Sequence, residues 1–166
     1  MSDVDKLMKQ LNLPPVSQIG VVVWDVDKAV EYYSSVFGIG PFNVYEFVPE
    51  KHWHMGEPSH SKVKMGKAML GSIELELIQP LEGKSIHQEF LDTRGEGLQH
   101  IAFNVSNYDD LFDRFVKAGF KPLIRSETYV PAYKGNLKAA YFDTDRVGGI
   151  LFEMCWKSWL PECNQP

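Results

Sequence analysis

The chain has 166 residues, of which 44% are hydrophobic and 23% are charged, and its formal net charge is -5. This composition is too apolar for a disordered chain, and the length is too short for a large multidomain enzyme, so we expect one or two small soluble units. The acidic balance argues against a nucleic-acid partner, and no apolar run approaches the roughly 20 residues of a membrane-spanning helix. Two cysteines, Cys155 and Cys163, without metal-ligand spacing favour a cytoplasmic setting.

The first half of the chain predicts a strand, a helix and three further strands. Residues 3–11 have apolar positions at helical spacing that stop before two prolines, so residues 1–16 are interpreted as an N-terminal helix and linker. A β-branched run at 19–23 predicts a buried strand, and 28–37 predicts a helix that Gly38 ends. The following strands are predicted over residues 42–48, 62–70 and 73–78.

The second half repeats this order after a linker. Residues 83–97 carry apolar groups at helical spacing and predict a linker helix between the halves. A strand over 100–105 and a helix over 108–118 follow, and residues 158–166 form a C-terminal tail. The remaining strands are predicted over residues 121–126, 137–142 and 149–155.

The two halves align with each other at both ends. Residues 18–27 lie over 100–109 without a gap, and 71–76 lie over 148–153. Two matches at opposite ends favour a duplicated unit over chance. We therefore predict an α+β fold made of two βαβββ modules, with boundaries at residues 17–82 and 98–157.

The repeat singles out four polar side chains. Gln18 and His100 open the first strand of each module, and Glu76 and Glu153 lie in the last strands, on the face opposite their apolar neighbours. If these faces meet, the four side chains converge on a site suited to a divalent ion such as Zn, Ni, Co, Mn or Fe. Taken singly, each has an ordinary alternative, such as a hydrogen-bonded histidine or a solvated glutamate. The correlated spacing favours a metal site, because a buried carboxylate is costly unless it is paired or metal-bound.

Several segments also resemble the vicinal oxygen chelate (glyoxalase/bleomycin resistance/dioxygenase) superfamily, most closely methylmalonyl-CoA epimerase and glyoxalase I. The resemblance covers residues 17–156 and rests on the segments 18–38, 73–80, 95–103 and 149–153. It implies a cupped, half-open barrel that holds a divalent metal. The family's ligand positions are matched here by Gln18, Glu76, His100 and Glu153.

Two positions depart from the epimerases. Gln18 stands where they commonly have histidine, a pattern seen in some glyoxalase I enzymes. The third strand, where epimerases carry a second acid/base glutamate, here runs from Ser61 to Lys67 without a carboxylate. This departure weakens the case for a two-base mechanism, and Gln18 also disfavours a two-histidine extradiol dioxygenase.

The predicted reaction is removal and return of a proton α to a carbonyl, with a metal stabilising the enolate. Glu153 is predicted as the base, and Glu76 as a ligand and candidate second base. We expect an epimerase or isomerase acting on a small molecule, such as an acyl-CoA thioester, and a homodimer. A glyoxalase I-like enzyme and a metal-free binding protein of the same fold remain alternatives.

Three weaker features complete the prediction. Residues 52–54, His-Trp-His, are interpreted as a mobile loop at the pocket mouth, with a second metal site as the alternative. Lys62, Lys64 and Lys67 suit either the phosphates of a CoA thioester or a solvated strand face. Residues 156–159 are expected to pack on the module or on a dimer partner.

Overall fold

The computed structural model describes residues 11–165. The helix predicted at residues 3–11 therefore lies, except for its last residue, outside the described part of the chain. Three α-helices lie wholly within that part, α2 (Val26–Phe37), α3 (Ile86–Arg94) and α4 (Tyr108–Lys117), together with two short 3-10 helices, Pro131–Tyr133 and Pro161–Asn164. Within the same part, no helix has the length and apolar content needed to cross a membrane.

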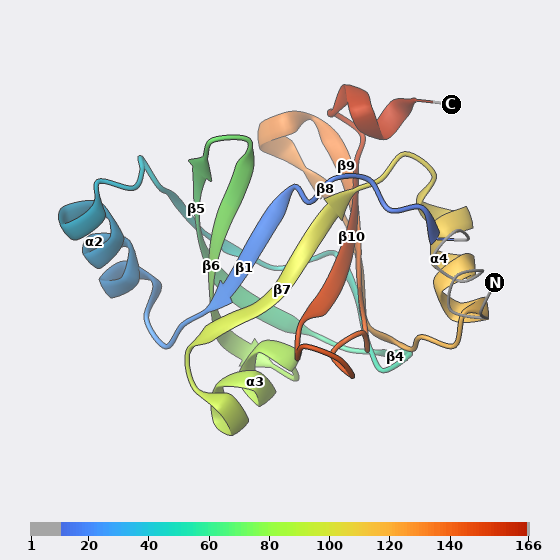
Figure 1. The fold of residues 1–166 in the computed structure, drawn as a ribbon, viewed down its shortest axis with the longest axis horizontal. Helices are drawn as coiled ribbons and strands as arrows, with labels where there is room; N and C mark the ends of the chain where they lie inside the picture. The colour runs from blue at the N-terminus through green and yellow to red at the C-terminus, as the bar shows by residue number, and fades with distance from the viewer. Residues whose placement is uncertain (1–10, 166) are drawn as a thin grey trace.

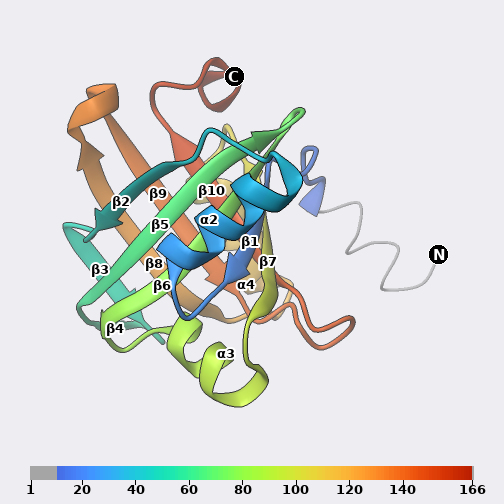
Figure 2. The same cartoon turned by 90° about the vertical axis from the view of Figure 1, so that its left-hand side faces the viewer.

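Ten strands form one strongly curled sheet, which both views show from different sides (Figure 1, Figure 2). Their order across the sheet is β2-β5-β6-β1-β7-β10-β9-β8-β3-β4. The strands of the first half are β1 (Gln18–Val22), β2 (Asn43–Phe47), β3 (Lys51–His54), β4 (Glu57–Pro58), β5 (Ser61–Leu70) and β6 (Ile73–Gly83). Those of the second half are β7 (Gly97–Asn104), β8 (Pro122–Val130), β9 (Gly135–Phe142) and β10 (Leu151–Lys157).

The sheet is built as two related halves. β1 and β7 pair antiparallel at its centre, and each also pairs in parallel with the last strand of its own half, β6 or β10. Helices α2 and α4 occupy corresponding places after β1 and β7 and lie at opposite ends of the molecule (Figure 1). This arrangement confirms the predicted α+β fold with a half-open, glyoxalase-like barrel.

Alternation along the strands separates the core from the inner face of the sheet. In β6, Leu75 and Leu77 are buried beneath α2 in a cluster with Val23 and Val26. Glu76, between the two leucines, must point to the opposite face because successive strand residues alternate. Helix α2 begins at the Asp25 cap, whose carboxylate accepts a hydrogen bond from the Lys28 amide. The helices thus cover the outer face and leave the inner face for a site.

The segment between β2 and β5 differs from the prediction. The prediction of a mobile loop at residues 52–54 is wrong. His52 and its neighbours form β3, which pairs with β8 of the other half. Trp53 packs beneath the Arg125 guanidinium at 5.3 Å. Strand 51–54 alternates polar and aromatic residues without an apolar face, so its pairing with β8 could not be read from hydrophobic periodicity.

The C-terminal aromatic residues pack on their own chain. The Trp156 indole nitrogen donates a hydrogen bond to the Cys163 carbonyl at 3.0 Å. The Trp159 ring stacks on Tyr133 with centroids 4.6 Å apart. Residues 156–159 are expected from the sequence to pack either on the module or on a dimer partner. In this chain they pack on the second module and the C-terminal tail.

Candidate metal centre

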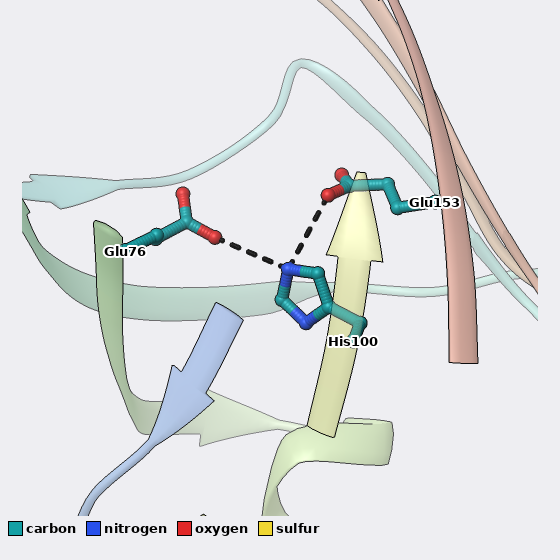
Figure 3. Close-up of side chains that lie close together, drawn as sticks. All are labelled: Glu76, His100 and Glu153. Atoms are coloured by element: carbon teal, nitrogen blue, oxygen red, sulfur yellow. Dashed lines mark ion pairs between the residues drawn. The ribbon is translucent and has the colours of Figure 1, made fainter. Parts of the chain in front are cut away.

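Three of the four predicted ligands meet on the inner face of the sheet. Glu76 comes from β6, His100 from β7 and Glu153 from β10, and the three side chains point toward one another (Figure 3). One ligand atom from each lies within 4.8 Å of the others. His100 Nε2 is 3.5 Å from Glu76 Oε2 and 3.4 Å from Glu153 Oε2. This is a compact set of one nitrogen and two oxygen donors.

A glycine makes this convergence sterically feasible. β1 lies between β6 and β7, and Gly20 is paired with Glu76 on one side and with His100 on the other. A Cβ atom at Gly20 would lie 1.8 Å from His100 Cε1, far inside van der Waals contact. The imidazole therefore occupies the space that a side chain at residue 20 would fill. Sequence reasoning missed Gly20, although a glycine inside a β-branched run often marks such a close approach.

The triad is buried and incompletely hydrogen-bonded. His100 is 0% exposed, Glu76 is 3% and Glu153 is 6%. Among the described residues, His100 Nε2 and Glu153 Oε2 have no hydrogen-bond partner. Buried polar atoms without partners are rare because they lose their hydration without compensation. A divalent ion between them would satisfy both atoms, so the residues present fit a metal.

Gln18 lies beside the triad. It is buried and lines the same cavity, but its amide nitrogen donates to Glu74 Oε1 at 2.6 Å. This hydrogen bond directs the amide group of Gln18 toward Glu74. The metal-ligand role of Gln18 therefore stays a prediction, whereas Glu76, His100 and Glu153 have the required mutual geometry.

The orientation of His100 is set by a glutamine next to it in the chain. The Gln99 amide nitrogen donates to the Ile86 carbonyl, so its oxygen is the acceptor for two imidazoles. His87 Nδ1 is 2.7 Å and His100 Nδ1 is 3.3 Å from that oxygen. Both Nδ1 atoms are then donors, which leaves His100 Nε2 as the ligand atom. Burial, together with the nearby His100, lowers the pKa of His87 to about 4 and keeps it neutral.

The two carboxylates have different partners at equivalent positions. Lys67 lies directly opposite Glu76 in the β5–β6 pair, and Tyr141 lies directly opposite Glu153 in the β9–β10 pair. Lys67 Nζ is 2.8 Å from Glu76 Oε1, and the Tyr141 ring, across the strand pair from Glu153, packs edge-on against His100 with centroids 5.0 Å apart. One carboxylate therefore lies opposite an ammonium group and the other opposite a neutral phenol.

The two carboxyl groups have pKa values shifted in opposite directions. Burial alone would raise the pKa of Glu76, but the Lys67 ammonium and the His100 imidazole outweigh it and hold that pKa far below its usual range. The pKa of Glu153 is raised, chiefly by burial. The nearby Glu76 carboxylate raises it further, and the opposing effect of His100 is smaller than that of burial. Opposed shifts in neighbouring carboxyls are a common sign of divided roles.

The triad opens into a small cavity of about 100 Å³. Its wall is mainly apolar, with a polar group at His52, whose two ring nitrogens have no partner among the described residues. Burial lowers the pKa of His52, and the nearby His54 and His60 lower it further, so this imidazole is neutral. The three lysines singled out in the sequence lie in different surroundings. Lys62 and Lys64 form ion pairs outside the cavity, whereas Lys67 lines the cavity.

Comparison with known proteins gives a family and a set of fold relatives. Residues 17–141 match the model of the Glyoxalase/Bleomycin resistance protein/Dioxygenase superfamily. The chain is 28% identical over 151 residues to the uncharacterized protein YqjC of Bacillus subtilis (strain 168), covering 84% of this chain and 90% of that one.

Two solved methylmalonyl-CoA epimerases share the fold. For the Mycobacterium tuberculosis enzyme the TM-score is 0.61 at 21% identity, covering 87% of this chain and 88% of that one. For a Streptomyces coelicolor variant in complex with 2-nitronate-propionyl-CoA the TM-score is 0.60 at 20% identity, covering 89% and 99%. From the family match over residues 17–141, this chain belongs to the glyoxalase/bleomycin resistance/dioxygenase superfamily.

Proposed function

We propose that this protein is a divalent-metal-dependent epimerase or isomerase that removes and returns a proton α to a carbonyl. The observation that carries the proposal is the Glu153 carboxylate. It is buried, its Oε2 lacks a partner among the described side chains, and it lies 3.4 Å from the ligand nitrogen of His100. A carboxylate that lines a cavity beside a candidate metal centre suits proton abstraction next to a carbonyl.

The metal would be held by Glu76, His100 and Glu153, with Gln18 as a further candidate ligand. When bound, it would supply Lewis-acid stabilisation of the negative charge that develops on the substrate oxygen. In this proposal Glu153 takes the α proton on the carboxylate oxygen that does not hold the metal, and its raised pKa brings it closer to neutral pH, where a general base is most effective.

Glu76 is better suited to be a permanent ligand than a second base. Its carboxylate is neutralised by Lys67, and its low pKa makes it a weak proton acceptor. Strand β5 has no carboxylate, although the two-base epimerase mechanism needs a second acid/base glutamate on this strand. We therefore propose that Glu153 alone removes the proton, and that the enolate turns in the site before Glu153 returns the proton to its opposite face, which inverts the α carbon.

The proposed substrate class is an acyl-CoA thioester with a short acyl group. Two fold relatives named above are methylmalonyl-CoA epimerases, and one of them was solved with a propionyl-CoA derivative. The cavity beside the triad has a mainly apolar wall, which suits a short acyl group at the metal centre with the rest of the thioester outside.

The test is hydrogen exchange in deuterated water. We expect the protein, loaded with Mn²⁺ or Co²⁺, to replace the α hydrogen of methylmalonyl-CoA with deuterium, followed by loss of the α-proton NMR signal. Glu153→Gln should lower the exchange rate by about 100-fold or more, the usual contribution of a general base. Glu82→Gln, on the same strand as Glu76 but exposed, should exchange at the wild-type rate. Absence of exchange in metal-loaded wild-type protein would refute the epimerase proposal.

A glyoxalase I-like activity is the second candidate, because Gln18, Glu76, His100 and Glu153 match the ligand residues of some glyoxalase I enzymes. The corresponding substrate is the hemithioacetal of methylglyoxal and glutathione. Formation of the thioester product from it, without exchange of methylmalonyl-CoA, would favour this activity.

A further inference from the structure

We infer that Lys67 determines which divalent ions the centre accepts, by withholding carboxylate oxygens from the metal. The inference rests on the metal centre of the proposed function, and it is independent of the substrate and of the reaction. Lys67 belongs to a strand whose other two lysines face away from the cavity, where they pair with Glu46, Glu82 and Asp27.

The Lys67 ammonium is paired with two carboxylates on the cavity wall. Nζ lies 2.8 Å from Glu76 Oε1 and 3.3 Å from Glu74 Oε1. Gln18 donates to the same Glu74 oxygen at 2.6 Å. Lys67 is therefore held as a fixed cation beside the triad, with a side chain only 20% exposed.

This arrangement divides the oxygens of Glu76. Oε1 is bound to Lys67, and Oε2 faces His100 Nε2 at 3.5 Å. The donors left for a metal are Glu76 Oε2, His100 Nε2 and one oxygen of Glu153. Three donors that include an imidazole suit Zn²⁺, Co²⁺, Fe²⁺ or Mn²⁺. Ca²⁺ instead takes about six to eight oxygen ligands, often from bidentate carboxylates.

Removal of the ammonium would change this donor set. Without Lys67, Glu76 could bind through both oxygens, and Glu74 would gain a free oxygen next to it. The positive charge that opposes a second cation in the same buried space would also disappear. Both changes favour hard, oxygen-seeking ions. The centre should then become less selective against Ca²⁺.

The test is ion titration of the full chain, after chelation and removal of the chelator, at neutral pH. We expect wild-type protein to bind Co²⁺ much more tightly than Ca²⁺. In Lys67→Met the Ca²⁺ affinity should rise by about tenfold or more, the usual scale of effects from groups behind a metal ligand. Lys67→Gln, which is also uncharged, serves as the second variant if the methionine form does not fold. Lys67→Arg keeps the cation and should retain the wild-type preference.

Lys62→Met is the matched control, because Lys62 lies on the same strand and pairs with Glu46 outside the cavity. It should leave both affinities unchanged. Ca²⁺ affinity that is equal to or lower than wild type in both uncharged Lys67 variants would overturn the inference, as would equal Co²⁺ and Ca²⁺ affinity in the wild type. Failure of the deuterium-exchange test would not alter these titrations, so the two proposals can fail separately.

Discussion

Gly20→Ala should damage the candidate metal centre through a single added methyl group. The new Cβ would lie 1.8, 2.1 and 2.4 Å from Cε1, Nε2 and Nδ1 of His100, where carbon contacts normally begin near about 3.5 Å. The imidazole cannot easily move aside, because it is fully buried and the Tyr141 ring packs edge-on against it at 5.0 Å. Either β1 separates from β7 or His100 leaves its position.

Overpacking of a buried site costs about 1–3 kcal/mol in the free energy of unfolding, and distances this short place the expected loss at the upper end or above it. Metal affinity should fall by about tenfold or more, because His100 Nε2 is displaced from the two carboxylates. Urea unfolding and Co²⁺ titration measure the two effects. Gly97→Ala is the matched control, since Gly97 lies on β7 and a Cβ atom there would meet nothing within 4 Å among the described residues.

The steric argument would be refuted by a Gly20→Ala protein that keeps its stability to within about 0.5 kcal/mol, the range of neutral surface substitutions. Unchanged Co²⁺ affinity would refute the link between Gly20 and the ligand geometry. Loss of stability in Gly97→Ala to the same extent would indicate that strand glycines matter here for backbone reasons, independent of His100.

Two further predictions concern the fold. The pKa of His87 is about 4 in the folded protein and about 6.5 in the unfolded chain. Between these pH values only the unfolded chain binds the proton. The free energy of unfolding should therefore fall as the pH drops from 6.5 to 4, by up to about 3 kcal/mol. Urea unfolding at several pH values measures this pH dependence of stability. The dependence should be weaker in His87→Gln and unchanged in the control His60→Gln, which alters an exposed histidine. Equal pH dependence in the wild type and both variants would contradict the prediction. Phe115→Ala should cost about 3–5 kcal/mol, because Phe115 is 1% exposed and stacks on Phe142 at 4.4 Å. Val147→Ala, at an 88% exposed position, should stay within about 0.5 kcal/mol, and similar losses for both would contradict the packing argument.

The fold could be predicted because the duplication leaves its pattern in the strands. Leu75 and Leu77 alternate with Glu74 and Glu76, so one face had to be apolar and the other polar. In the second half, Phe152 and Met154 flank Glu153 as the two leucines flank Glu76, although the strand is otherwise apolar on both faces. The internal alignment then placed the two polar faces in equivalent positions, which is why three of the four predicted ligands meet in the structure.

The rest of the site depends on contacts between strands that no periodicity encodes. Lys67 follows Lys62 and Lys64 along a polar strand, and only the pairing of β5 with β6 reveals that it faces Glu76. From the sequence alone, Gly20 is a residue that weakens a strand. Its role becomes clear only from the structure, in which the His100 ring lies over it. Strand β3 forms by pairing with β8, about 70 residues away, so its hydrogen bonds are invisible in the local sequence.

The duplication also explains why the two carboxylates need different neighbours. Glu76 and Glu153 occupy equivalent positions in related modules, and geometry alone would make them equivalent ligands and equivalent bases. The residue directly across each strand pair removes this equivalence: the Lys67 ammonium lowers the pKa of Glu76, whereas Tyr141 places no cation beside Glu153, whose pKa burial raises. The proposed division between ligand and base therefore depends on the residue opposite each carboxylate, and most directly on Lys67.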